Sequence, residues 1–314
     1  MRRSVSLFAL AALAACVVQP SSTGGQPSPA PATEVRPTLA AAAETPFSPS
    51  TPNAACADPQ PQTIDRSYSG AAVNGEVPVF IVLPPCYESS GTTYPVVYFL
   101  HGKPMTETQW RDLGLPETLA QGWGEGRWPA LIAVAPRLPE PIFSNSDGGP
   151  GSYEDEFFQG LVPFIESTVL AETQPGGRAI VGISRGGVWA LELALTHPDT
   201  VGSAAGLSPA LAVNYARAAY DPLQLAGQAL SLPRVFLGAG RDDWARLMTE
   251  RLATELEGRD GDVELSIVEG SHEEATWLRL LPQALDFLTE PWEAFGGPAS
   301  GIKVESRRGT DDRD

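Results

Sequence analysis

The sequence predicts an α/β domain, a three-layer α/β/α sandwich built on a mostly parallel sheet. Short apolar runs rich in β-branched residues alternate along the chain with segments of helical periodicity. Strands of a parallel sheet are buried on both faces and therefore read as near-continuous apolar runs. A chain of 314 residues also has the length that α/β proteins usually fill with one large domain.

The start of the chain has the pattern of an export signal. Arg2 and Arg3 precede an apolar stretch at residues 5–15, which is too short to span the roughly 30 Å of membrane hydrocarbon. Residues 13–16, Leu-Ala-Ala-Cys, resemble the bacterial lipobox, in which the peptide is cut before a cysteine that carries diacylglycerol. We therefore expect a lipoprotein signal peptide at residues 1–15 and a lipid on Cys16 that anchors the protein to the extracytoplasmic face of the cell membrane. An ordinary secretory signal that contains a cysteine is the alternative.

Two flanking segments are predicted to be disordered. Residues 16–55 are rich in Pro, Ser, Thr, Ala and Gly, a composition that buries too little apolar surface to offset the entropy of ordering, so they form a tether. Residues 296–314 lack apolar periodicity and form a tail. The folded domain is thus expected at residues 56–295.

The elements of this domain follow one another in regular alternation. Apolar runs at residues 77–83, 96–100, 131–135, 179–183, 202–207, 235–237 and 263–268 are predicted strands. Helical patterns occur at residues 155–170, 186–195, 243–256 and 273–288. Ligands of such sheets bind beyond the carboxyl ends of the strands, so the residues directly after each run are the candidates for a site.

Charge and cysteine content exclude several classes of function. The formal net charge is −17 with a pI near 4.6 and no dense Lys/Arg stripe, which argues against nucleic acid as a partner.

Cys56 and Cys86 remain after Cys16 is assigned, and export permits them to form a disulfide, with two free buried thiols as the alternative. Neither cysteine has a metal-ligand spacing, and the chain has 3 histidines, so we expect no metal and no cofactor.

Ser184 is the candidate nucleophile. It stands in the pattern Gly-x-Ser-x-Gly, formed with Gly182 and Gly186, between a predicted strand and a predicted helix. Glycines at these positions permit a sharp turn that lifts the hydroxyl clear of the sheet, and the helix dipole behind it favours an anionic intermediate. The alternative is a glycine-rich turn between strand and helix with no chemical role.

A serine hydroxyl needs an adjacent base, and His272 is the best candidate. It lies shortly after the predicted strand at 263–268, near the C-terminus. His197 lies where the helix after Ser184 stops, at the end away from the turn, and is expected to be a helix-end residue. His101 follows a strand but precedes Ser184, against the Ser-acid-His order of this kind of fold, and is expected to support its loop.

The remaining parts of a serine-hydrolase site are an acid and an oxyanion hole. Asp242 and Asp243 both follow the strand at 235–237, and their positions alone barely separate them, since Asp243 could instead cap the next helix. Two backbone N–H groups usually bind the oxyanion. The first is expected from Arg185, and the second from Lys103, because the next residue, Pro104, has no N–H.

These residues resemble the esterase family of α/β-hydrolases, which includes esterase D, enterochelin esterases, feruloyl and acetyl-xylan esterases and antigen 85-type mycolyltransferases. The resemblance covers about residues 63–288 and is carried by residues 79–87, 94–102, 157–166, 182–187 and 270–272, with Trp110 and Trp277. It implies the α/β-hydrolase fold. In the family the acid stands three residues after a glycine that ends its strand, which after Gly240 implies Asp243.

Two residues depart from the family pattern. Arg185 stands where Met or Gln is commonest, and Glu273 follows the histidine where Asp or Ser is frequent. We expect the Arg185 side chain to pair with Glu273 or another carboxylate, with binding of an acidic substrate as the alternative.

The sequence therefore predicts a serine esterase that cleaves carboxylic esters, small or carbohydrate-linked, through an acyl-serine intermediate. The alternatives are an acyltransferase of the mycolyltransferase type with the same three residues, and a surface binding lipoprotein without turnover. Peptidase activity ranks below these. Residues that select the substrate are expected in the loop 137–153 and near Trp244.

Overall fold

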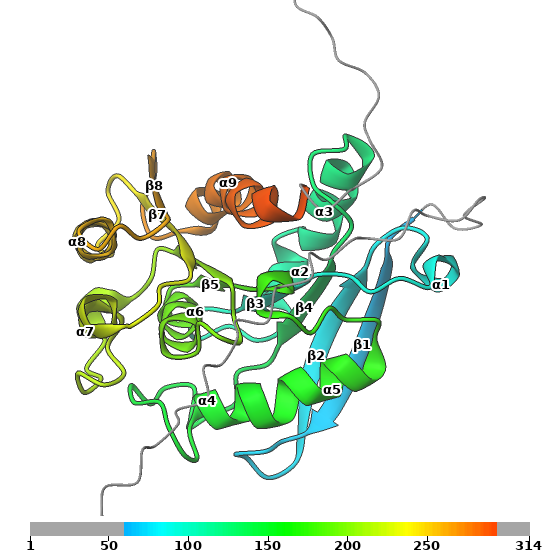
Figure 1. Cartoon of the computed structure of the whole chain (residues 1–314), viewed down its shortest axis with the longest axis horizontal. Helices are drawn as coiled ribbons and strands as arrows, with labels where there is room; N and C mark the ends of the chain where they lie inside the picture. Colours follow the sequence, from blue (N-terminus) through cyan, green and yellow to red (C-terminus); the bar gives the residue numbers. More distant parts are fainter. Residues whose placement is uncertain (1–59, 294–314) are drawn as a thin grey trace, which may run out of the picture. The chain divides into compact units, whose positions relative to one another are not determined.

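The computed structural model describes residues 60–293, whose centre is an eight-stranded sheet in the order β1-β2-β4-β3-β5-β6-β7-β8 (Figure 1). Strands β4, β3, β5, β6, β7 and β8 pair in parallel, whereas β1 and β2 form an antiparallel edge. The predicted mostly parallel sheet is confirmed. The strands are β1 (Gln62–Ser69), β2 (Glu76–Leu83), β3 (Val96–Leu100), β4 (Ile132–Pro136), β5 (Arg178–Ile183), β6 (Ser203–Leu207), β7 (Arg234–Gly240) and β8 (Val263–Val268).

Helices cover both faces of the sheet. Helices α5 and α6 pack on one face, where α7 and α8 join α6, and helices α2, α3 and α9 pack on the other. The helices are α1 (Tyr87–Ser90), α2 (Gln109–Asp112), α3 (Leu115–Gly124), α4 (Tyr153–Asp155), η1 (Glu156–Leu161), α5 (Val162–Thr168), η2 (Pro175–Gly177), α6 (Arg185–Thr196), η3 (Leu211–Val213), α7 (Pro222–Gln228), α8 (Arg246–Glu257) and α9 (Glu274–Glu293).

Strand β3 shows why the central strands lack polar alternation. Val96, Tyr98 and Leu100 enter the core under α5 and α6, while Val97 and Phe99 enter the opposite core under α2, α3 and α9. All of these side chains are buried. A strand with two apolar faces requires two helical layers, which is the three-layer arrangement that the sequence predicts.

Some boundaries differ from the predicted ones. The helix expected at 155–170 is the continuous run of α4, η1 and α5, and the helix expected at 243–256 begins only at Arg246. Strand β1 and helices α3 and α7 were not expected. The predicted signal peptide, tether and tail, as well as Cys16 and Cys56, lie outside the described residues. Between residues 60 and 293, no helix is long and apolar enough to cross a membrane.

Candidate active site

Ser184 lies in a strained turn between β5 and α6. Its backbone has φ 53° and ψ −113°, a region that costs a non-glycine residue about 1–3 kcal/mol. The turn is so tight that a Cβ on Gly182 would lie 2.1 Å from the carbonyl oxygen of Gly186, and one on Gly186 would lie 2.4 Å from that of His101. Close backbone approach therefore explains both glycines of the Gly-x-Ser-x-Gly pattern.

The structure brings the predicted nucleophile, base and acid together in one hydrogen-bonded chain. The Nε2 atom of His272 lies 3.0 Å from Ser184 Oγ, and its Nδ1 atom lies 3.0 Å from Asp243 Oδ1 and 3.2 Å from Oδ2. The three residues follow β5, β8 and β7, at the carboxyl edge of the sheet. Asp242, by contrast, is exposed. The arrangement has the geometry in which a carboxylate orients an imidazole that accepts a proton from serine.

Asp243 is held as a carboxylate although its side chain is fully buried. Burial raises the pKa of this group, but hydrogen bonding to His272, the nearby Ser208 hydroxyl and the N–H of Ala245 together bring the pKa below its ordinary value. The Ala245 N–H donates to Asp243 Oδ1 at 2.8 Å. This contact belongs to the turn before α8, whose N-cap is Ala245 and which has no side-chain capping bond, so Asp243 does not cap the helix.

Ser208 is a neighbour of this site that the sequence reading missed. It follows β6 at the same edge of the sheet, is fully buried and has φ 48°, and its N–H donates to Gly238 O at 2.7 Å. Its Oγ atom makes no hydrogen bond of normal geometry within the described residues, yet it lies close enough to Asp243 to lower the pKa of that carboxyl group. The one feature of the sequence that could have indicated Ser208 is its position directly after a predicted strand.

Two tryptophans enclose the imidazole of His272. The ring of Trp244 lies 4.5 Å from it at an interplanar angle of 32°, and the ring of Trp277 lies 5.4 Å from it, edge to face. Trp277 is buried, whereas Trp244 is 49% exposed. Trp244 thus forms an apolar wall between the base and solvent, at a position where the sequence predicts a residue that contacts substrate.

The two expected oxyanion donors belong to segments that adjoin Ser184. Arg185 is the first residue of α6, so its N–H has no partner within the helix. Gly102, which precedes Lys103, packs against Ser184: a Cβ on Gly102 would lie 3.4 Å from Ser184 Cβ. Within the described residues, neither the Lys103 N–H nor the Arg185 N–H donates a hydrogen bond. Both groups remain available to a ligand beside the hydroxyl.

His101 fixes the loop that carries Lys103. Burial lowers the pKa of His101 to about 4, so its ring is neutral. Its Nε2 atom accepts the N–H of Leu138 at 2.9 Å, which places the proton on Nδ1, and Nδ1 donates to Gly102 O at 3.0 Å. Gln109 Oε1 accepts the Gly102 N–H at 2.7 Å. These contacts hold the peptide before Lys103 from both sides, in agreement with the loop-supporting role expected for His101.

The side chain of Arg185 does not make the ion pair that the sequence suggests. Its guanidinium donates to Phe143 O and Asn214 Oδ1, each at 3.1 Å, and also to Asn145 O, and it lies 5.2 Å from the Trp189 ring. It forms no ion pair with Glu273 or any other carboxylate of the described residues. The expectation was wrong because the side chain extends along the loop at 143–145 and bridges that loop to Asn214.

His197 lies away from this site. It is the residue at which α6 ends, and its Nε2 atom lies 2.5 Å from Glu154 Oε1, so it is a helix-end residue as expected. Within residues 60–293, no group of His, Cys, Asp or Glu side chains is arranged to hold a metal ion.

Proteins of known sequence and structure resemble this chain over most of the described region. A family model described as "Putative esterase" matches residues 70–291. "Esterase Rv1288" of Mycobacterium tuberculosis is 31% identical over 147 residues, which are 45% of this chain and 31% of that protein. "Uncharacterized protein YbbA" of Bacillus subtilis is 25% identical over 177 residues, which are 52% of this chain and 67% of that protein. The matched region is thus about a third of the length of the mycobacterial relative.

Solved structures share the fold. A ferulic acid esterase superposes with a TM-score of 0.67 at 21% identity, over 74% of this chain and 98% of that one. An S-formylglutathione hydrolase from Staphylococcus aureus superposes with a TM-score of 0.63 at 16% identity, over 73% of this chain and 99% of that one. The family match begins before Gly102 and extends beyond His272, and the chain therefore belongs to the esterase family of α/β-hydrolases.

Proposed function

We propose that this protein is a serine esterase that cleaves carboxylic esters through an acyl-serine intermediate on Ser184. The observation that carries the proposal is the continuous hydrogen-bonded chain from buried Asp243 through His272 to Ser184, with contacts of 3.0 Å on both sides of the imidazole. Membership of the esterase family and the esterase named among the relatives favour hydrolysis over acyl transfer or mere binding.

The acylation step follows from this geometry. His272 Nε2 takes the proton of Ser184 as Oγ attacks the ester carbonyl, and the N–H groups of Arg185 and Lys103 receive the negative charge on the carbonyl oxygen. Because both donors are fixed by backbone packing and by His101, they need little reorganisation as the charge develops. The alcohol then leaves with the proton from His272, and the acyl group stays on Ser184.

Deacylation reverses the roles with water as the nucleophile. His272 removes a proton from water, which attacks the acyl-serine, and the acid is released as Ser184 regains its proton. Asp243 keeps Nδ1 of His272 protonated throughout, since its lowered pKa keeps it ionised across the neutral range.

The decisive experiment compares residues 17–314 with the same chain carrying Ser184→Ala. Both are treated with a fluorophosphonate probe and with 4-nitrophenyl esters of increasing acyl length. We expect labelling and turnover in the parent chain and their loss in the variant, at unchanged thermal stability. A folded parent chain that neither reacts with the probe nor turns over any ester would contradict the proposal and favour a binding protein.

We also propose that the protein is exported and anchored through a lipid on Cys16, with Cys56 bridged to Cys86. The export pattern of residues 1–15 and the composition of residues 16–55 support the anchor, and the even number of remaining cysteines supports the bridge. Radiolabelled palmitate should enter the full-length protein and not its Cys16→Ser variant. A thiol count without reductant tests the bridge, and two reactive thiols would contradict it.

A further inference from the structure

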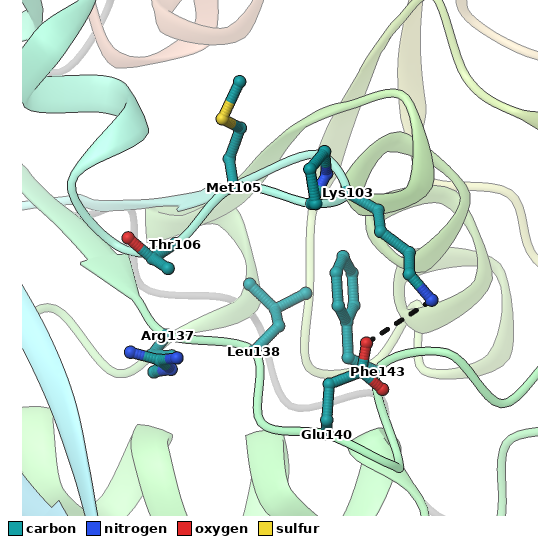
Figure 2. A pocket seen from close by; sticks show the side chains of 8 residues that line it. Lys103, Met105, Thr106, Arg137, Leu138, Glu140 and Phe143 are labelled. Atoms are coloured by element: carbon teal, nitrogen blue, oxygen red, sulfur yellow. Dashed lines mark ion pairs between the residues drawn. The ribbon is translucent and has the colours of Figure 1, made fainter.

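A cavity of about 150 Å³ adjoins the loop that carries Lys103, one of the two proposed oxyanion donors. Two segments form it: the loop after β3, which carries Lys103, and the loop after β4, which begins with Arg137. Figure 2 shows the side chains of Leu138 and Phe143 between these two cationic residues. The lining residues are Lys103, Pro104, Met105, Thr106, Arg137, Leu138, Glu140 and Phe143.

Both segments that form the cavity pack against the turn at Ser184 and Arg185. On one side, a Cβ atom added to Gly102 would lie 3.4 Å from Ser184 Cβ. On the other, the carbonyl oxygen of Phe143 accepts a hydrogen bond from Arg185 Nε at 3.1 Å. Lys103, whose N–H is an expected oxyanion donor, also lines the cavity, so part of an ester bound at Ser184 can extend toward it.

The two cations of the cavity differ in how far they are neutralised. Lys103 Nζ lies 3.5 Å from Glu140 Oε1 and contacts Ser144 Oγ, which itself donates to Glu140 at 2.6 Å (Figure 2). Arg137 has a looser partner, because its Nη1 atom lies 3.8 Å from Glu107 Oε2. Its guanidinium makes no hydrogen bond of normal geometry within the described part of the chain, and its side chain is 49% exposed.

We propose that this cavity is a subsite for an ester that carries a carboxylate, and that Arg137 binds this carboxylate. The planar guanidinium offers paired N–H donors that match a carboxylate, and the apolar side chains of Met105, Leu138 and Phe143 suit a short hydrocarbon segment between the carboxylate and the ester. The chain has a net charge of −17, but Arg137 places a positive charge in the lining of the cavity and has its ion-pair partner 3.8 Å away, so it can attract an anion. The inference rests on the proposed esterase function.

The test uses two esters of equal acyl length, mono-4-nitrophenyl adipate and 4-nitrophenyl hexanoate. kcat/KM is measured for residues 17–314, for Arg137→Gln, and for Arg251→Gln, which removes the same charge from the exposed surface of α8. We expect Arg137→Gln to lower kcat/KM for the adipate ester by about tenfold and to leave the hexanoate ester nearly unchanged. Arg251→Gln should change neither ester by more than about twofold.

A second variant, expected to raise the preference for the charged ester, distinguishes a change in binding from a loss of structure. Glu140→Gln removes the negative charge nearest to Lys103, so the preference for adipate over hexanoate should rise severalfold. Added salt should weaken the preference in the parent chain, because a half-exposed ion pair is screened. A pair with the carboxylate on the alcohol side, 3-carboxyphenyl hexanoate and phenyl hexanoate, shows whether the acyl or the alcohol part enters the cavity.

The outcomes separate this inference from the esterase proposal. Hydrolysis of hexanoate with equal rates for charged and neutral esters in both pairs, unaffected by Arg137→Gln, would overturn the carboxylate subsite and leave the esterase standing. Absence of turnover with every ester would overturn the esterase itself. Loss of the preference in Arg137→Gln for either charged ester, with hexanoate turnover retained, would support the subsite.

Discussion

Asp242 and Asp243 are neighbours in the chain that the fold places in opposite environments. Asp243 is buried and contacts His272 and the N–H of Ala245, while Asp242 is exposed. Their sequence positions scarcely separate them, and it was the resemblance to the esterase family that favoured Asp243. The physical difference between them is the side on which each side chain leaves the backbone at the end of β7, which only the folded turn determines.

The variant Asp243→Asn should lower kcat by roughly three to four orders of magnitude. An amide in this place cannot stabilise the imidazolium, and its NH₂ group favours the wrong tautomer of His272. The variant Asp242→Asn, with the same chemical change in an exposed neighbour, should keep kcat within about twofold. Steady-state kinetics on a 4-nitrophenyl ester measure both; equal losses in the two variants would contradict the assignment.

Glu192 is a buried acid on α6 that takes no part in the proposed chemistry. It is 1% exposed, and burial raises its pKa from 4.5 to about 9, which nearby Arg185 opposes only in part. Between these two pH values the folded protein keeps a proton that the unfolded chain releases. The stability contributed by this group is therefore greatest below about pH 4.5 and falls as the pH rises toward 9.

The variant Glu192→Gln should therefore stabilise the protein at alkaline pH. We expect a rise of on the order of a few kcal/mol at pH 8, seen as roughly 5 °C or more in Tm, which shrinks toward zero at pH 4. Thermal unfolding of the two proteins across this pH range measures it. A difference in Tm that stays constant with pH would show that Glu192 ionises normally.

At the scale of elements, the turn between β5 and α6 depends on glycine for lack of space. A Cβ on Gly182 would lie 2.1 Å from the backbone of Gly186. Gly182→Ala should therefore destabilise the fold by more than about 2 kcal/mol, because backbone atoms cannot move aside as a flexible side chain can. Gly124→Ala, at the end of α3 where nothing lies within 4 Å, should instead be neutral or stabilise by up to about 1 kcal/mol. Urea unfolding of both variants tests the contrast.

The elements that could be predicted from the sequence are those with a regular apolar pattern. The runs at β3 and β8 were located to the residue, since apolar residues fill β3 completely and alternate with Glu264 and Ser266 along most of β8. Strand β1 was missed because its residues are mostly polar and exposed, as an edge strand permits. Helix α3 was missed because Pro116, Gly122 and Gly124 interrupt its apolar pattern, and its helical form depends on packing against the sheet.

The same limit applies to the site. Ser184 and His272 could be named as candidates because a spaced glycine pattern and the scarcity of histidine left few choices, and the structure places their side chains within hydrogen-bond distance. The roles of Ser208 and His101 could not be derived in detail, since they depend on contacts between segments that the sheet brings together. The predicted ion pair of Arg185 was wrong for the same reason: the loop at 143–145 approaches α6 only in the folded chain.

At the scale of the whole molecule, the residues of the candidate site follow strands that differ in how far they are buried. Strand β5 lies inside the sheet and is wholly buried, whereas β8 lies at the edge of the parallel part and its residues are partly or fully exposed. His272 lies four residues after the end of β8. The base is thus attached to the least protected strand of the parallel part of the sheet.

Amide hydrogen exchange should therefore be faster in β8 than in β5, by at least an order of magnitude. In urea, esterase activity should fall before the far-ultraviolet circular dichroism, because loosening of β8 displaces His272 while the rest of the sheet stays paired. Equal protection of the two strands, with coincident loss of activity and secondary structure, would indicate a single cooperative transition instead.

If His272 is the base, as proposed, its position also determines when a newly made chain first contains all three residues of the mechanism. Ser184 and His272 are 88 residues apart, which a ribosome needs roughly 4–18 s to add. During that interval a growing chain has its hydroxyl and, later, its carboxylate, but no base to activate the serine. Under the proposed mechanism, a nascent chain therefore acquires its base only after its last strand has been made.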